Sequence, residues 1–186
     1  YNGIVEAFKT AAAKMPRVDA IGVSSAGIYV DNECRVASLF LKVNEEDFAA
    51  RVQNIYKRAA QELGDVPLSV ENDGDGTALA GAMGLGDGAL LGMAMGTSEA
   101  AGYVDENGHI TGWLNELAFA PVDGQPAAMR DEWSGDIGCG VKYFSQDGVI
   151  KLAGFAGIEL AGASPAEKLK EVQALMAAGD ARAEAI

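Results

Sequence analysis

Cysteine and histidine are scarce in this sequence. The 186 residues include two cysteines, Cys34 and Cys139, which lie far apart and outside any CxxC spacing, and one histidine, His109. These numbers exclude a disulfide framework and offer no zinc site built on paired cysteines. Because cysteine usage of this kind fits a reducing compartment, we expect a cytoplasmic protein.

Basic residues are also few. Fourteen Lys and Arg stand against 27 Asp and Glu, which gives a formal net charge of −13. This excess of negative charge repels phosphate backbones and anionic lipid, so neither nucleic acid nor a membrane surface is expected as a partner. No apolar run approaches the roughly 20 residues that a membrane-spanning helix needs, and no basic segment precedes an apolar stretch as in a secretory signal.

What remains is an ordinary globular composition, with 49% hydrophobic and 22% charged residues. Such a chain can form one core or two small lobes. It opens at Tyr1 rather than Met, and its apolar residues already have helical spacing there. We therefore expect a piece of a longer protein.

Strand and helix patterns alternate up to residue 84 and a hairpin pattern follows, which predicts an α/β fold with a mixed sheet. The clearest helix is capped by Asn44 and stopped by Gly64, and a later helix carries the capping box SPAE, Ser164 to Glu167. Strands are predicted at 18–24, 36–43, 66–70 and 89–95, a short helix at 77–83, a hairpin at 100–104 with 109–111, and long ordered loops at 115–146. The apolar strands 18–24 and 89–95 are expected to be covered on both faces.

Three turns after strands follow one another in a recognisable order. IGVSSAG ends one strand, END precedes the helix TALAGA, and GT ends an apolar strand. In this order they resemble the ROK family of sugar kinases, from about Val18 to Ser145. The strongest piece, ENDGDGTALAGA, is similar to the family's E-N-D-A-N-x-A-A-L-A-E.

The resemblance implies an actin-like ATPase fold of the ribonuclease H-like kind, with lobes of mixed sheets flanked by helices, here incomplete. A glycine-rich stretch at 84–88 then divides the chain into part of an N-terminal lobe, residues 1–84, and part of a C-terminal lobe, residues 85–186.

The resemblance also implies that Asp73 is the catalytic base. Phosphoryl transfer to a sugar hydroxyl needs a carboxylate within hydrogen-bond reach to accept the hydroxyl proton. Asn72 would orient the sugar, because an amide side chain both donates and accepts hydrogen bonds. The alternative is that Asn72 and Asp73 only cap the following helix. We assign Asp75, nearer the predicted helix start at Thr77, to capping.

Gly96 and Thr97 resemble the second phosphate-binding turn of the fold, where backbone N–H groups approach phosphate oxygens. The family pattern is G-T-G-x-G-x-G, whereas this chain reads GTSEAAG. Ser98 and Ala100 stand where glycines are expected, and Glu99 adds a negative charge that opposes an anion. An ordinary glycine turn between strands is the alternative interpretation.

Glu116 in NELAF aligns with the acid of the family's G-E-I-G-H, which would bind sugar hydroxyls. Phe119 replaces the histidine that, with a cysteine cluster, holds a structural zinc in many members. Only Cys139 of that cluster remains, so no zinc is expected. Val141 replaces a second sugar-binding glutamate, and His109 is expected at the surface after an NG turn.

The resemblance implies ATP and Mg as cofactors, yet the family's first phosphate loop, D-x-G-G-T-x, is not found before Val18. We expect it in the longer protein. The function implied is a glucokinase-like transfer of the ATP γ-phosphoryl group to a small-molecule sugar. One alternative is a non-catalytic sugar or metabolite sensor on the same fold; another is an acidic α/β domain that binds a protein partner. The sugar and the oligomeric state, a homo-oligomer included, stay open.

Overall fold

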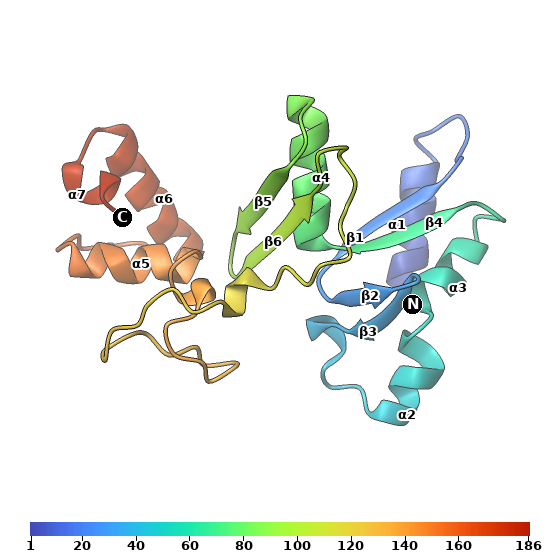
Figure 1. The fold of residues 1–186 in the computed structure, drawn as a ribbon, viewed down its shortest axis with the longest axis horizontal. Helices are drawn as coiled ribbons and strands as arrows, with labels where there is room; N and C mark the ends of the chain where they lie inside the picture. The colour runs from blue at the N-terminus through green and yellow to red at the C-terminus, as the bar shows by residue number, and fades with distance from the viewer. The chain divides into compact units, whose positions relative to one another are not determined.

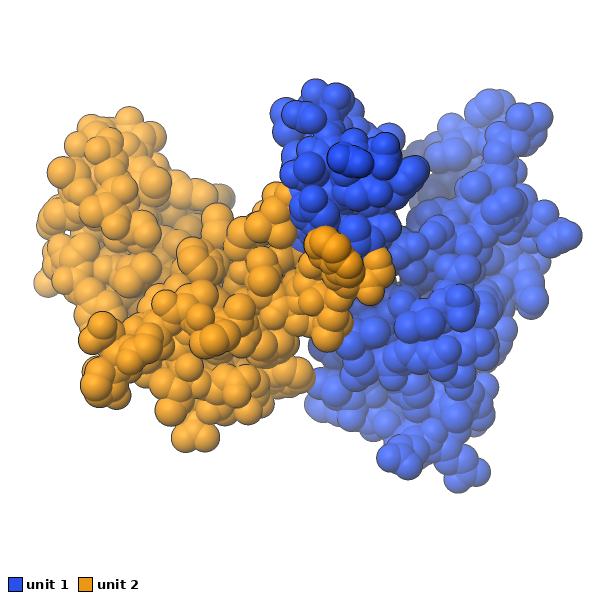
Figure 2. All heavy atoms as spheres, in the orientation of Figure 1, with its two compact units in different colours: residues 1–90, 102–111 blue, residues 91–101, 112–186 orange.

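A computed structural model describes all 186 residues and contains two compact units (Figure 2). Unit 1 comprises residues 1–90 and 102–111, and unit 2 comprises residues 91–101 and 112–186. The division passes through the hairpin of β5 (Leu90–Met95) and β6 (Glu99–Val104). The lobe limits expected from the sequence, 1–84 and 85–186, stay a prediction.

A parallel pair of strands forms the centre of unit 1. β1 (Ile21–Ser25) pairs with β4 (Leu68–Asn72) in the register that joins Ile21 to Leu68 and Ser25 to Asn72. Helices α1 (Asn2–Ala12) and α3 (Ile55–Gln61) pack with this pair (Figure 1). The helices and strands share one apolar cluster, whose members are Ile4, Phe8, Val23, Tyr29, Phe40, Ile55, Tyr56, Leu68 and Val70.

A hairpin that the sequence analysis missed follows β1. Its strands, β2 (Ile28–Val30) and β3 (Glu33–Val36), are joined by Asp31 and Asn32, whose φ angles are 53° and 63°. Two successive positive φ angles are typical of a tight hairpin turn. The Asn32 amide also donates to the Leu68 carbonyl at 2.9 Å and accepts from the Val70 N–H at 2.7 Å, which fastens the hairpin to β4.

The strand predicted at 36–43 is wrong, because the hairpin already ends at Val36. The 3-10 turn η1 (Ser38–Phe40) follows, and Phe40 packs against a cluster that contains Cys34 and Val52. The predicted helix after Asn44 is present in three pieces: α2 (Glu45–Asp47), the π-helical η2 (Phe48–Val52) and α3. The Asn44 cap is confirmed, since its side chain accepts from the Asp47 N–H at 2.9 Å.

Helix α4 (Asp73–Leu85) begins four residues before the predicted start at Thr77 and ends at a left-handed Gly86. Its buried Ala78 and Ala82 pack against Val104 of β6 and Leu90 of β5. β5 was expected to be covered on both faces, but this is wrong for the present chain. Leu91, Met93 and Met95 are 52%, 38% and 63% exposed.

Helices dominate the end of unit 2. α5 (Gln146–Phe155), α6 (Pro165–Ala177) and α7 (Ala181–Glu184) share a core built on Ala153, Ile158, Val172 and Ala183. The predicted capping box at Ser164 and Glu167 is confirmed. Two 3-10 turns, η3 (Leu117–Phe119) and η4 (Gly140–Lys142), lie in the segment predicted to be loops. No helix of the chain is long and apolar enough to cross a membrane.

In place of the one mixed sheet that was expected, the chain has three two-stranded sheets. One is the parallel pair β1–β4, one is the antiparallel hairpin β2–β3, and the third is β5–β6. The α/β class is therefore correct, whereas each sheet is smaller than expected.

Candidate functional site

The carboxyl ends of β1 and β4 lie side by side in unit 1. Their register places Ser25 opposite Asn72, and helix α4 starts at the next residue, Asp73. In open α/β sheets, ligands bind in the crevice outside the carboxyl ends of parallel strands. The N-terminus of a helix adds a positive partial charge at the same place. The predicted base thus lies where this kind of fold binds its ligands.

Asn72 connects three parts of this edge. Its Oδ1 accepts from the Gly74 N–H at 2.7 Å, which caps α4, and its Nδ2 donates to the Gly27 carbonyl at 2.8 Å. The capping interpretation is therefore correct for Asn72. Each end of the amide keeps one further hydrogen-bond position, a second N–H and a second lone pair, and its predicted role in sugar binding stays a proposal.

Asp73 differs from its polar neighbours in having no hydrogen bond or ion pair on its side chain. Glu71 accepts from the Ser69 hydroxyl at 2.7 Å, Asn72 is engaged as described, and Asp75 also has an interaction partner. The half-buried Asp73 contributes only its carbonyl, which accepts from the Thr77 hydroxyl at 2.9 Å. Its carboxylate thus has no hydrogen-bond or ion-pair partner within this chain.

The capping role assigned to Asp75 is wrong. Asn72 is the N-cap, and Asp75 lies inside the first turn of α4. Strand β6 approaches that turn so closely that a Cβ on Gly102 would lie 2.4 Å from the Cα and N atoms of Asp75. The glycine at position 102 lets strand and helix touch through their backbones, which fixes the first turn behind Asp73.

Two tyrosines hold the end of β1. The Ser25 hydroxyl is 2.9 Å from the Tyr56 hydroxyl and accepts from the Tyr29 hydroxyl at 2.9 Å, while the two rings meet edge to face with centroids 5.8 Å apart. Burial raises the pKa of Tyr29 well above its ordinary value. The Tyr29 hydroxyl therefore stays protonated at neutral pH, and its bond to Ser25 is a structural contact.

Gly96 and Thr97 lie in the exposed turn between β5 and β6, in unit 2. The Gly96 N–H donates to the Ser98 carbonyl at 2.9 Å, so this amide is occupied within the turn. A Cβ on Gly96 would meet only the Ser98 oxygen, at 3.9 Å, so glycine is not sterically required there. This geometry fits an ordinary turn at Gly96, and Thr97 beside it is exposed.

Glu99 is buried beside that turn, at the start of β6. It is 6% exposed, and its Oε2 has no hydrogen-bond partner. A Cβ on Gly140 would lie 2.5 Å from this oxygen, so the carboxyl group lies directly against the η4 backbone. Burial raises the pKa of Glu99, because an ionised carboxylate loses hydration there.

Glu99→Gln is expected to stabilise the protein at pH 8 and to have a smaller effect at pH 5. Since the folded state has the raised pKa, it binds the proton more tightly than the unfolded state, and wild-type stability falls as pH rises above the ordinary glutamate value of 4.5. Each kcal/mol gained should raise Tm by about 2–4 °C in a domain of this size. Thermal unfolding at the two pH values measures the difference. The exposed Glu106→Gln is the control, and an equal effect of Glu99→Gln at both pH values would contradict this account.

The remaining predicted contacts also lie in unit 2. Glu116 immediately precedes η3 and already has an interaction partner. Phe119 ends η3, and its ring packs against Trp133 with centroids 5.5 Å apart. Val141 lies within η4, next to the buried Cys139 and Gly140. Asn72 and Asp73 thus lie together in unit 1, whereas Gly96, Thr97 and Glu116 belong to unit 2.

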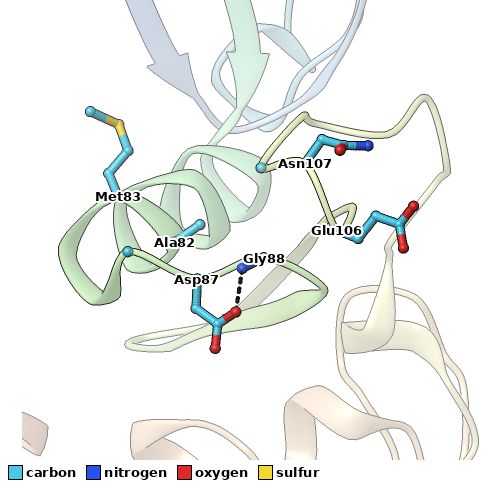
Figure 3. Close-up of a pocket in the computed structure, with 8 residues that line it drawn as sticks. Ala82, Met83, Asp87, Gly88, Glu106 and Asn107 are labelled. Atoms are coloured by element: carbon cyan, nitrogen blue, oxygen red, sulfur yellow. Dashed lines mark hydrogen bonds between the residues drawn. The ribbon is translucent and has the colours of Figure 1, made fainter.

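A shallow pocket of about 410 Å³ lies at the opposite end of α4 from Asp73 (Figure 3). It is lined by Ala82, Met83, Gly86, Asp87, Gly88, Glu106, Asn107 and Gly108. None of the residues predicted from the sequence lines it. The Asp87 carboxylate accepts from the Gly88 N–H at 2.8 Å, a contact within the turn itself. Its lining includes part of the glycine-rich stretch 84–88 and the Asn107–Gly108 turn, to which the sequence assigned no binding role.

Solved structures with the same architecture were found for nearly the whole chain. A ROK hexokinase from Thermus thermophilus shares 21% identity with a TM-score of 0.66, covering 99% of this chain and 60% of its own. The chain has the fold of ROK-family proteins. The resemblance inferred from the sequence is thus confirmed at the level of the fold.

Two further ROK-fold structures have different activities in their descriptions. A ROK family glucokinase from Streptomyces griseus, in complex with glucose and AMPPNP, shares 23% identity, with a TM-score of 0.62 over 98% of this chain and 62% of its own. A ROK family transcriptional regulator, a homologue of the E. coli MLC protein, shares 20%, with a TM-score of 0.67 over 97% and 46%. This chain therefore spans about half to three fifths of these ROK-fold chains. No protein-family model and no curated protein matches the sequence.

Proposed function

We propose that this chain is part of a ROK-like sugar kinase that transfers the γ-phosphoryl group of ATP to a sugar hydroxyl. The observation that carries the proposal is the Asp73 carboxylate. It follows the carboxyl end of a parallel strand pair, starts a helix, and has no partner while its polar neighbours are engaged.

In the proposed reaction, Asp73 accepts the proton of the sugar hydroxyl as the sugar oxygen bonds to phosphorus, and the bond from the γ-phosphorus to ADP breaks. Asn72 and Glu116 are proposed as sugar contacts, with Gly96 and Thr97 near the phosphates. Mg²⁺ would neutralise phosphate charge. This chain has no group of three or more His, Cys, Asp or Glu that could hold a metal ion, and Mg²⁺ in such sites is usually held by one or two carboxylates together with the substrate phosphates.

A sensor without kinase activity is the second candidate. Glu99 buried beside the proposed phosphate turn, the occupied Gly96 amide, and Phe119 and Val141 at two motif positions all favour it. A regulator is also among the proteins of the same fold. Such a protein would bind a sugar without turning over ATP.

An assay of ADP formation distinguishes these candidates. It uses the full-length protein with a panel of hexoses and N-acetylated amino sugars. A sugar-dependent rate above the sugar-free background supports the kinase. Calorimetric sugar binding without nucleotide binding supports the sensor, and the absence of binding to either ligand contradicts both. We expect the active protein in the cytoplasm, as the low cysteine content indicates.

A further inference from the structure

Residues 120–140 form a long loop with almost no regular structure. Two isolated antiparallel bridges, Pro121 to Cys139 and Arg130 to Ile137, are its only strand-like contacts. A connection of this length without secondary structure needs some other means of being held in place. In many proteins of the family that the sequence resembles, a zinc ion fills that role.

The residues present do not fit a zinc site. Phe119 stands where the resemblance places a histidine ligand, and its ring contacts the indole of Trp133. Cys139 is the only thiol of the loop and is 1% exposed.

A buried lysine lies at the base of the loop instead. Lys142 of η4 is 5% exposed, and its ammonium donates to Glu132 Oε2 at 2.5 Å. It also lies 3.8 Å from Asp131 Oδ1, while the other oxygen of Glu132 lies 3.9 Å from Lys151 of α5. One cluster thus connects the loop, η4 and α5.

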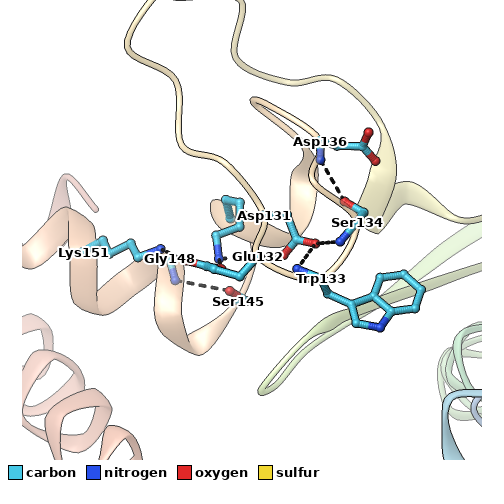
Figure 4. A network of polar contacts seen from close by, with 9 residues as sticks. Asp131, Glu132, Trp133, Ser134, Asp136, Ser145, Gly148 and Lys151 are labelled. Atoms are coloured by element: carbon cyan, nitrogen blue, oxygen red, sulfur yellow. Dashed lines mark hydrogen bonds and ion pairs between the residues drawn. The ribbon is translucent and has the colours of Figure 1, made fainter. Parts of the chain in front are cut away.

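Asp131 fixes the shape of the loop in addition to facing the ammonium. It is 7% exposed, and its Oδ2 accepts from the Ser134 N–H at 2.7 Å and from the Trp133 N–H at 3.2 Å (Figure 4). The Asp136 carbonyl accepts from the Asp131 N–H at 2.8 Å and closes the turn. The carboxylate therefore holds the turn on one side and the lysine on the other.

The shifts in pKa within the cluster favour a charged lysine between two charged carboxylates. The Ser134 N–H and the nearby Lys142 lower the pKa of Asp131, and the hydrogen bond from Lys142 lowers that of Glu132. Burial by itself would lower the pKa of Lys142, but the bond to Glu132 and the two carboxylate charges outweigh it, so this pKa is raised. A buried charge left without its partners is strongly unfavourable, so the lysine and the loop must stay together.

We infer that the buried Lys142, held by Asp131 and Glu132, fastens the loop of residues 120–140 in place of a structural metal. A chelator should therefore leave the conformation of the loop unchanged, whereas replacing the lysine should destabilise it. This inference holds for either proposed function, because it concerns how the loop is held rather than what the protein binds.

Hydrogen exchange of residues 129–138 in the full-length protein tests the inference. A zinc chelator is expected to leave their exchange unchanged, whereas Lys142→Met should accelerate it about tenfold or more. Lys151→Met, at the edge of the same cluster, is the control and should change exchange less than about twofold. The two fold-changes differ because leaving a buried charge unpaired costs more free energy than losing an exposed ion pair.

Should Lys142→Met not fold, Glu132→Gln tests the same contact, because the Glu132 side chain is 77% exposed and replacing it should leave the fold intact. It should accelerate exchange by a factor between those of Lys151→Met and Lys142→Met. One equivalent of bound zinc whose removal releases the loop would overturn the inference, as would unchanged exchange in both variants.

Discussion

Asp73→Asn is expected to slow sugar phosphorylation by the full-length protein about 100- to 10,000-fold, the usual cost of losing a general base. The amide keeps the size of the side chain, and Asp73 makes no side-chain hydrogen bond or ion pair that the substitution would break. Folding and sugar affinity should therefore change little. Steady-state rates of ADP formation with the best sugar of the panel give kcat, and calorimetry gives the sugar Kd.

Asp87→Asn is the matched control for this prediction. Asp87 follows the other end of α4, where its carboxylate accepts only from the Gly88 N–H. Its replacement should leave kcat within about twofold, since an exposed side chain outside the reaction contributes little. Equal turnover by wild type and Asp73→Asn would remove Asp73 from the mechanism.

Gly102→Ala is expected to destabilise the protein by about 3 kcal/mol or more. The added methyl group would overlap backbone atoms, which cannot rotate away as a side chain can, so the cost lies at the upper end of the range for overpacking. The added Cβ would lie 2.4 Å from the Cα and N atoms of Asp75 and from the carbonyl carbon of Gly74. These are backbone atoms of the first turn of α4. Either the turn or β6 must move, and urea unfolding of the full-length protein measures the cost.

Gly84→Ala, in helix α4 itself, provides the opposite control. A Cβ on Gly84 meets no atom within 4 Å. Alanine is a better helix former than glycine, so the variant should gain about 0.5–1 kcal/mol. If Gly102→Ala were no more destabilising than a typical surface substitution, the close contact of β6 with α4 would be incorrect.

The sequence predicts best where one local rule decides the structure. The capping box at Ser164 and Glu167 satisfies its own backbone, so its four residues are enough to place the start of α6. The strand before Asn72 and the strand at 89–95 were likewise found, because short β-favouring runs end at turn residues. The order of these turns also predicted the fold.

Prediction failed where a distant contact overrides the local pattern. The glycines of DGDG are poor helix formers, yet Asn72 caps them and β6 packs on them, so α4 begins early. Asp31 and Asn32 adopt positive φ angles without glycine, helped by the bonds of Asn32 to β4. Lysine is almost never fully buried without a partner, so nothing in the sequence marks Lys142 as a core residue.

Asn72 has a consequence for how a substrate could be sensed. One end of its short amide holds the carbonyl of Gly27 and the other holds the first turn of α4. The Gly27 turn is therefore linked to the start of the helix, and to the adjacent Asp73, through this one side chain. A ligand that bound at the Gly27 turn would thus act next to the anchor of the proposed proton acceptor.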